Sequence, residues 1–329
     1  MIIIVLVQAC KCCSPQNVRI KYTNPGSYLI SNCQFLNFDT SIIHGGVIGV
    51  NAANINLSIF SATFYNCRCS YNGGAIDYSS STGGNFIFDK GCANKCYTKS
   101  TTFISYQFAG LGVSDNGINE ISLVSCSQCS PNLDYTKYDC MNIGYGNQKI
   151  ISCNLTSNYA AKRSGITGYL IASFVSKYCT FSNSESADTT LLQLIAAQCS
   201  PTINFMNFIN CSQKGNTYGL IHLKTPGQLE VSDSTFSKNT KVLFFIEQGT
   251  ILLKKNIISH NMASLSYGSV TTESNNQFIS DPNIGTIALS FYSTDYCLTD
   301  VFKIPSIASS NNAIPNHPHW VFLFLQIIE

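Results

Sequence analysis

The chain has 329 residues, a net charge of +2 and only 11% charged residues. This composition contains neither the basic footprint of a nucleic-acid-binding protein nor an acidic disordered tail. Asparagine, serine and threonine supply the polar surface in place of ions.

The first residues, Met1 to Val7, form a short apolar run. The run lacks the basic segment of a secretory signal peptide and is short for one. Two interpretations of residues 1–29 follow from it: an N-terminal strand or coil that caps the fold, or the remnant of a signal peptide.

Two similar repeats come next. Phe35 precedes the double glycine Gly45–Gly46, and 28–29 residues later Phe64 precedes Gly73–Gly74. A double glycine before an apolar strand permits a corner with positive φ and close packing of neighbouring coils. We therefore interpret Gly45, Gly46, Gly73 and Gly74 as structural residues of the repeat.

The repeat is less regular from Cys92 to Tyr145, where five cysteines, several glycines and Pro131 gather. We expect one or two coils there, with a loop insertion near residues 130–140.

The clearest repeats lie between Lys149 and Asn261. One apolar position recurs at steps of 26, 27, 28 and 22 residues, at Leu155, Phe181, Phe208, Phe236 and Ile258. Self-similarity at a period of roughly 20–50 residues indicates a stacked-repeat architecture. We expect these apolar side chains to stack inward in one column.

Each repeat contains three short apolar segments, which is too little chain for a crossover helix. The repeats therefore predict an all-β fold: a single parallel β-helix of about nine coils over residues 30–285. An antiparallel β-sandwich is the alternative. Asparagines at the end of the repeated motif are expected to tolerate a left-handed corner and to bond neighbouring backbone; they are Asn158, Asn183, Asn210 and Asn239.

The last region, residues 286–329, is predicted to hold a final coil, a loop with Pro315 and Pro318, and an apolar tail from Trp320 to Ile328. The tail is nine residues long, whereas a membrane-spanning helix needs about 20. The sequence thus contains no complete membrane span.

Sixteen cysteines are many for this length. The spacing does not fit a zinc site, because Cys126-x-x-Cys129 has no second such pair at a usual distance. Disulfides in a secreted protein are the better interpretation. Three glycosylation sequons, at Asn56, Asn154 and Asn210, give mild support for the secretory route.

Cys153 and Cys179 each lie two residues before an aligned apolar residue. By the period of two they should point inward from adjacent coils, about 4.8 Å apart along the ladder. A disulfide between them and a buried ladder of free thiols are the two alternatives.

The Gly-Gly-x-Ile motifs at Gly45–Ile48 and Gly73–Ile76, with the Phe-x-x-Asn motif Phe236–Asn239, resemble the polymorphic membrane protein (Pmp) family of chlamydial and trichomonad surfaces. The resemblance covers roughly residues 30–280. The cysteine-rich and Asn/Ser-rich character is closer to the trichomonad branch. The resemblance implies a right-handed, pectin-lyase-like parallel β-helix that is secreted or displayed at the cell surface. It also implies a role in adhesion to a host-cell or extracellular-matrix protein or glycan.

Carbohydrate-active β-helix enzymes are the rival class. Glycoside hydrolysis needs paired carboxylates, and the sequence has no Asp-Asp or Asp-x-Asp; isolated acids such as Asp77 and Asp89 could still converge from stacked coils. A lyase would need acids for calcium and an arginine base, and only Arg19, Arg68 and Arg163 are available. We therefore expect a non-enzymatic protein without catalytic residues, metal or cofactor, and keep a polysaccharide lyase or hydrolase as the alternative.

Overall fold

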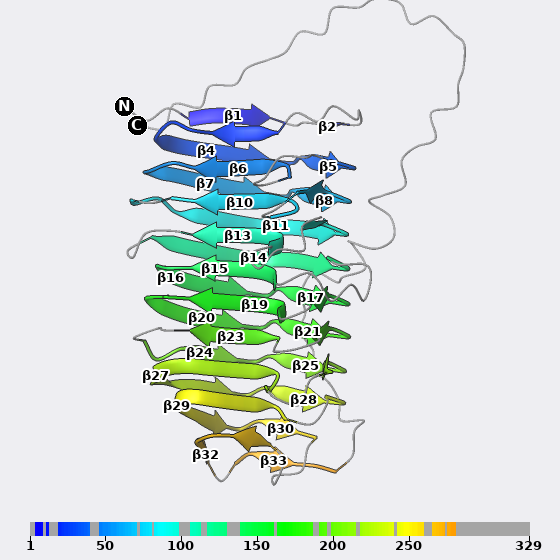
Figure 1. Ribbon diagram of the computed structural model, residues 1–329, viewed down its shortest axis with the longest axis vertical. Helices are drawn as coiled ribbons and strands as arrows, with labels where there is room; N and C mark the ends of the chain where they lie inside the picture. The colour runs from blue at the N-terminus through cyan, green and yellow to red at the C-terminus, as the bar shows by residue number, and fades with distance from the viewer. Residues whose placement is uncertain are drawn as a thin grey trace, which may run out of the picture.

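The computed structural model describes residues 4–8, 11–12, 19–39, 46–70, 73–80, 82–98, 106–112, 117–129, 139–160, 163–186, 191–195, 199–214, 218–239, 242–259, 265–273 and 275–280. All regular elements in these segments are strands, and their pairings are parallel. The strands stack as coils along one long axis (Figure 1). The prediction of an all-β parallel solenoid is confirmed, and the antiparallel sandwich is excluded. Right-handed winding and a count of about nine coils stay predictions.

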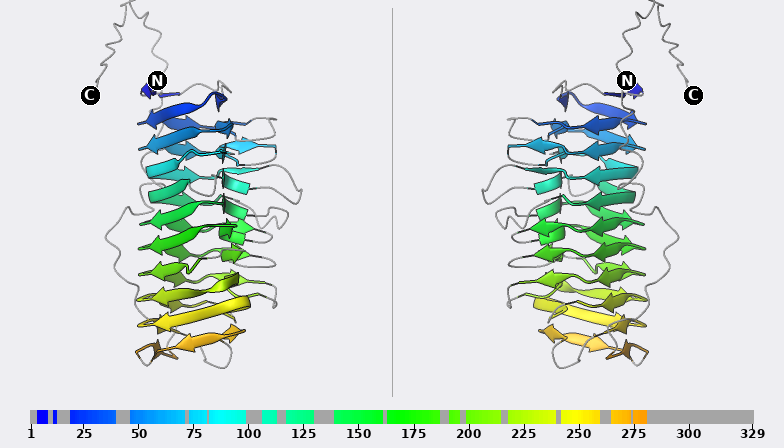
Figure 2. Two further views of the ribbon diagram at one scale, coloured as in Figure 1. Left: turned by 90° about the vertical axis from the view of Figure 1, so that its left-hand side faces the viewer. Right: turned by 90° about the vertical axis from the view of Figure 1, so that its right-hand side faces the viewer.

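Strands from successive coils stack in three main ladders, seen from two further sides in Figure 2. The first ladder runs through β1 (Ile4–Gln8), β4 (Gly26–Ser31), β7 (Ile55–Phe60), β11 (Phe86–Asn94), β14 (Ile118–Ser127), β16 (Asn147–Ile151), β20 (Ser173–Lys177), β24 (Thr202–Asn204), β27 (Ile221–Ser232), β29 (Phe244–Lys254) and β32 (Val270–Thr272).

The second ladder contains shorter strands. It runs through β2 (Lys11–Cys12), β5 (Gln34–Leu36), β8 (Thr63–Tyr65), the later parts of β11 and β14, β17 (Asn154–Thr156), β21 (Thr180–Ser182), β25 (Asn207–Ile209), β28 (Thr235–Ser237), β30 (Ile257–Ile258) and β33 (Gln277–Phe278).

The third ladder closes the coil. It runs through β3 (Ile20–Tyr22), β6 (Ile48–Asn51), β10 (Ile76–Ser79), β13 (Tyr106–Gly112), β15 (Asp139–Gly144), β19 (Arg163–Tyr169), β23 (Leu192–Ile195), the first parts of β27 and β29, and β31 (Ser266–Tyr267). Two minor ladders join β9 (Arg68–Cys69) to β12 (Tyr97–Thr98), and β18 (Tyr159–Ala160) to β22 (Glu185–Ser186) and β26 (Ser212–Gln213).

Some sequence predictions fall on residues outside the described segments. They concern Gly45, the inserted loop at 130–138 and the whole C-terminal region 286–329. At the other end, the backbone of β1 pairs with β4 and lies at one end of the solenoid (Figure 1).

The core is a set of columns in which equivalent inward side chains of successive coils lie against one another. In the second ladder Leu155 is aligned with Phe181, Phe181 with Phe208, and Phe208 with Phe236. The Phe181 and Phe208 rings stack with centroids 5.2 Å apart, and those of Phe208 and Phe236 with centroids 4.7 Å apart. A 26–28-residue coil therefore places one aromatic ring directly over the next, and the apolar face of each coil is buried by its neighbours.

Corners with left-handed backbone flank the short strands of the second ladder. Around Phe208, Phe205 has φ 53° and Asn210 has φ 49°. Equivalent pairs occur at Asn32 and Asn37, Ser61 and Asn66, Ser152 and Ser157, Tyr178 and Asn183, and Asp233 and Lys238. This conformation costs most L-residues about 1–2 kcal/mol, but asparagine visits it readily, which accounts for Asn183 and Asn210.

The asparagines one position later in the motif, Asn158 and Asn239, do not adopt the left-handed conformation predicted for them. At Asn158 and Asn239 the left-handed residue is the one before, Ser157 or Lys238. Asn239 instead accepts the Cys211 N–H at 2.9 Å and donates to the Phe208 carbonyl at 2.7 Å. The two roles predicted for one asparagine are thus divided between neighbouring positions.

Inward polar side chains form a second hydrogen-bonded column, two residues before the aligned apolar position. Asn256 accepts the Ser234 N–H at 3.0 Å and donates to the Val231 carbonyl at 2.8 Å. Along this column, each side chain accepts a hydrogen bond from the backbone N–H of the equivalent residue in the preceding coil. The N–H of Cys153 donates to Cys179 Sγ, that of Cys179 to Met206 Sδ, that of Met206 to Ser234 Oγ, and that of Asn256 to Asn276 Oδ1. Asparagine, serine, cysteine and methionine all supply a partner for the same buried backbone group.

One residue of each double glycine lies where the backbone leaves no room for a side chain. A Cβ on Gly46 would lie 2.0 Å from the Gly74 carbonyl oxygen, and Gly73 has φ +60°. Both positions therefore require glycine for backbone reasons.

Replacing Phe208 by alanine should lower the free energy of unfolding by about 3–5 kcal/mol, because the ring is fully buried between two stacked rings. Urea unfolding followed by circular dichroism measures the loss. The control Tyr267→Ala, at a side chain that is 67% exposed, should cost at most about 1 kcal/mol. Equal losses for the two variants would contradict the stacked core.

Replacing Asn256 by alanine should lower the free energy of unfolding by about 2–4 kcal/mol, because it removes the partners of the buried Ser234 N–H and Val231 carbonyl. The same urea titration gives the value. Asn51→Ala, at an exposed asparagine, is the matched control and should change stability by less than about 0.5 kcal/mol. A negligible loss of unfolding free energy in Asn256→Ala would contradict the stabilising role of these two corner hydrogen bonds.

Candidate functional site

Polar side chains line the outer side of the first ladder. Asn56 donates to Ser27 Oγ at 3.2 Å, Asn85 donates to Asn56 Oδ1 at 3.1 Å, and Ser173 donates to Asn147 Oδ1 at 2.8 Å. These side chains are half-buried, and each is held by the coil before or after it. These contacts order amide and hydroxyl groups on part of the outer face, where paired charges such as Lys149 and Glu120 also lie.

The glutamates of the described segments are paired with lysines of other coils. The pairs are Lys149 with Glu120 at 3.0 Å, Lys214 with Glu185 at 3.2 Å, Lys224 with Glu247 at 2.8 Å, and Lys254 with Glu230 at 2.9 Å and Glu273 at 3.7 Å. Surface pairs of this kind contribute little to stability. They do raise the pKa of Lys254, mainly through its hydrogen bond to Glu230.

Glu230 and Glu273 are two carboxylates that a single lysine, Lys254, bridges. A glycosidase places two carboxyl groups about 5–9.5 Å apart on either side of the scissile bond. Here Lys254 Nζ lies between the two carboxylates, where substrate or water would have to be. The arrangement is therefore an ion-pair triad and not a vacant acid–base pair.

The two aspartates that the sequence left as candidates lie on different ladders. Asp77 is in β10 of the third ladder, where its charge raises the pKa of Arg19, although burial lowers that pKa overall. Asp89 is in β11 of the first ladder and accepts a hydrogen bond from Ser122 Oγ at 2.8 Å. Each carboxylate therefore has its own local environment.

A polar cluster that the sequence analysis did not identify lies on the third ladder. Arg163 Nη1 donates to Gln193 Oε1, and Gln193 Nε2 lies 2.6 Å from His222 Nδ1. Because the Gln193 oxygen is the acceptor for arginine, its amide nitrogen must donate to His222 Nδ1. The neutral His222 ring consequently carries its proton on Nε2.

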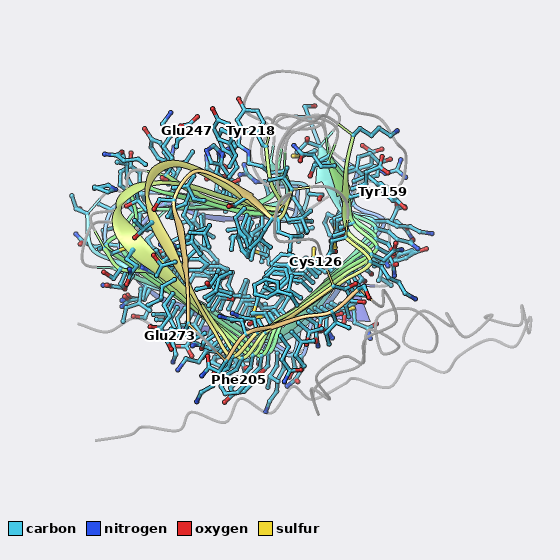
Figure 3. The ribbon with its side chains drawn as sticks, turned by 90° about the horizontal axis from the view of Figure 1, so that it is seen from below. Cys126, Tyr159, Phe205, Tyr218, Glu247 and Glu273 are labelled. Atoms are coloured by element: carbon cyan, nitrogen blue, oxygen red, sulfur yellow. The ribbon has the colours of Figure 1, made fainter. Side chains whose placement is uncertain are left out.

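The other side of His222 faces Glu247, with Nε2 3.8 Å from the carboxylate. The rings of Tyr218 and Phe245 lie 5.4 Å and 5.0 Å from the imidazole. Figure 3 places Glu247 and Tyr218 on the same outer side of the solenoid. Burial lowers the pKa of His222 to about 4, although Glu247 opposes this shift and Lys224 and Arg163 add to it. His222 is therefore neutral at pH 7 and its Nε2 atom is buried.

This cluster can position charges but is poorly arranged for proton transfer. A general acid or base works best with a pKa near the operating pH and with access to substrate. His222 satisfies neither condition, and Glu247 is held by Lys224. Gln193 and His222 are 29 residues apart, which is close to the repeat period. This spacing is the sequence signal that could have predicted their contact.

The three sequon asparagines lie at different exposures. Asn210 is exposed and donates to Asn183 Oδ1 at 2.7 Å, whereas Asn56 and Asn154 are half-buried. Asn210 therefore offers the most room for a glycan among them. Glycosylation at all three stays a prediction.

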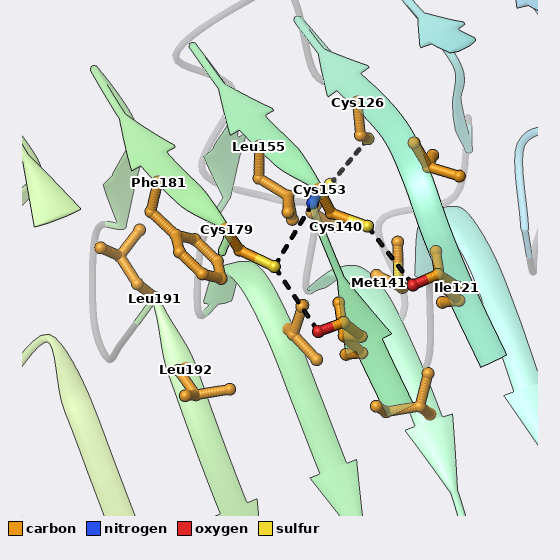
Figure 4. Packing of buried hydrophobic residues seen from close by; sticks show 14 of the residues in the cluster. Ile121, Cys126, Cys140, Met141, Cys153, Leu155, Cys179, Phe181, Leu191 and Leu192 are labelled. Atoms are coloured by element: carbon orange, nitrogen blue, oxygen red, sulfur yellow. Dashed lines mark hydrogen bonds between the residues drawn. The ribbon is translucent and has the colours of Figure 1, made fainter. Parts of the chain in front are cut away.

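Cys153 and Cys179 lie in adjacent coils and both are buried free thiols (Figure 4). The Cys153 N–H donates to Cys179 Sγ at 3.4 Å, and the thiols donate to the carbonyls of Ile121 and Ile150 respectively, as well as to nearer carbonyls. The thiol ladder, one of the two alternatives from the sequence, is the form present in this structure.

Within the described residues no group of three or more His, Cys, Asp or Glu side chains is arranged to hold a metal ion. The same segments contain no helix long and apolar enough to span a bilayer. No family model matches the chain, and neither the curated proteins nor the solved structures contain a match to it.

Lowering the pH from 6.5 to about 4 should destabilise the wild-type protein more than the His222→Gln variant. With its pKa lowered to about 4, folded His222 binds fewer protons in this window than the unfolded chain does. Its contribution to stability is complete above pH 6.5 and is lost as the pH falls. Urea unfolding at several pH values measures the difference between the two proteins.

The Glu247→Gln variant provides an independent check on the same histidine. The Glu247 charge favours protonated His222, so its removal should lower the histidine pKa further and keep the low-pH destabilisation. Identical pH profiles for wild type and His222→Gln would contradict the buried neutral histidine.

Proposed function

We propose that this protein is a non-enzymatic, adhesin-like display protein of the cell surface or of the secreted fraction. The observation that carries the proposal is the state of its glutamates: the five that the structure describes are each paired with a lysine of another coil. A catalytic site would need at least one carboxyl group that can exchange a proton with substrate.

The outer faces support the same function. Stacked Asn and Ser side chains present amide and hydroxyl groups at the regular spacing of the ladder, about 4.8 Å. Such a surface offers many weak hydrogen bonds over a long distance, which suits binding of an extended protein or glycan partner. The Gly-Gly-x-Ile and Phe-x-x-Asn repeats, which resemble the Pmp family, point to the same class of proteins.

A carbohydrate-active enzyme is the second candidate, and the Glu230–Lys254–Glu273 triad is the observation in its favour. If a substrate displaced the lysine, the two carboxylates would be left on opposite sides of one site. This function requires measurable turnover that depends on both glutamates.

Incubating the purified chain with polygalacturonate and related glycans, with calcium present, should release no product, because Glu230 and Glu273 are both held in ion pairs with Lys254. Binding of the same glycans, and of host-cell and extracellular-matrix proteins, is measured in parallel on immobilised protein. We expect saturable binding to at least one of these ligands without cleavage.

The double variant Glu230→Gln/Glu273→Gln separates the two candidates. Product release that this variant abolishes would establish the enzyme and overturn the adhesin proposal. Binding that survives in the variant, with no turnover in either protein, is the result expected of an adhesin.

A further inference from the structure

Three cysteine sulfurs meet at one corner inside the solenoid. Cys126 Sγ lies 3.5 Å from Cys129 Sγ and 3.6 Å from Cys140 Sγ. The three side chains are at most 1% exposed. Figure 4 shows the Cys126–Cys140 contact, and Figure 3 shows Cys126 pointing to the interior. The Cys-x-x-Cys motif that does not fit zinc therefore has a third thiol beside it.

The three cysteines come from different positions of the fold. Cys126 is aligned in β14 with Leu155 of the next coil, so it is not stacked on a cysteine of its own column. Cys129 follows the left-handed corner at Gln128, which has φ 51°. Cys140 is in β15, 14 positions after Cys126. Because the three cysteines are not stacked directly over one another, their side-chain torsions are not restricted in the way that the torsions of directly stacked residues are.

The distances fit bond formation by side-chain rotation. A disulfide needs its sulfurs about 2.05 Å apart, so either pair would have to close by roughly 1.5 Å.

We propose that Cys126, Cys129 and Cys140 form a thiol–disulfide centre, in which Cys126 bonds to either Cys129 or Cys140. The oxidant is a small-molecule disulfide such as oxidised glutathione. Two protein thiols give up two protons and two electrons to form one S–S bond, and the small-molecule disulfide takes them up to become two thiols. The third cysteine, as a thiolate, can then attack Cys126 Sγ and form a new disulfide with Cys126. The earlier partner of Cys126 is released as a thiolate.

The two bonds would have different mechanical effects. A Cys126–Cys129 bond joins residues of one corner, whereas a Cys126–Cys140 bond ties β14 to β15.

Contacts with Cys129 and Cys140, together with burial, raise the pKa of Cys126 well above its usual value. At neutral pH little thiolate is present, so the bond forms during folding and exchanges slowly afterwards.

The test is to refold the reduced full-length chain in a buffer of reduced and oxidised glutathione. Remaining thiols are blocked by alkylation, and the disulfides are located by peptide mass spectrometry. We expect Cys126 bonded to Cys129, to Cys140, or to a mixture of both. Cys211→Ser is the matched control, because Cys211 is an equally buried cysteine whose thiol donates to carbonyls; its map should be unchanged at Cys126.

Two single variants make the exchange visible. In Cys129→Ser the bond should be entirely Cys126–Cys140, and in Cys140→Ser it should be entirely Cys126–Cys129. Raising the pH should speed interconversion in the wild-type protein. Complete alkylation of Cys126 in the refolded wild-type protein, or its bonding to any other cysteine, would overturn the proposal.

Discussion

The structure depends on how the buried corners of each coil satisfy their backbone groups. Along the strands, N–H and C=O groups pair with the coils on either side. At the corners the chain turns through left-handed residues, and some of these groups can be reached only by a side chain. A buried backbone group without a partner costs about 1–3 kcal/mol, and the corner recurs in coil after coil. Between Cys153 and Asn276, polar and sulfur-bearing residues supply these partners, whereas the equivalent corner position in earlier coils holds Ala62 and Val124.

This constraint explains an unusual composition. Asparagine satisfies a corner with two hydrogen bonds, as Asn256 does, while serine, cysteine and methionine accept one from the preceding coil. Cysteine combines a weak donor and acceptor with a small apolar volume. Most of the described cysteines are therefore buried in the interior as corner and core residues, whatever their later redox chemistry.

The outside of the solenoid follows from the same repetition. Because equivalent residues of successive coils lie side by side, a lysine one period from a glutamate meets it, as Lys149 meets Glu120. Neutral amides and hydroxyls interact in the same way, as Asn56 does with Ser27. The described outer faces therefore carry paired charges, polar ladders and stacked exposed rings such as those of Tyr178 and Phe205.

Periodicity alone determined the fold of this protein to a large extent. The 26–28-residue steps place Phe181, Phe208 and Phe236 in register, since a parallel ladder converts a sequence period directly into contact. The period aligns Gln193 with His222, but it could not show that Arg163 joins them, because the residue aligned with Gln193 in the preceding coil is Thr167. Nor could it show that Cys129 and Cys140 reach Cys126, because those contacts cross a corner and link different ladders. Contacts within a column are fixed by counting residues, whereas contacts between columns depend on corner angles and side-chain direction, which only the tertiary structure decides.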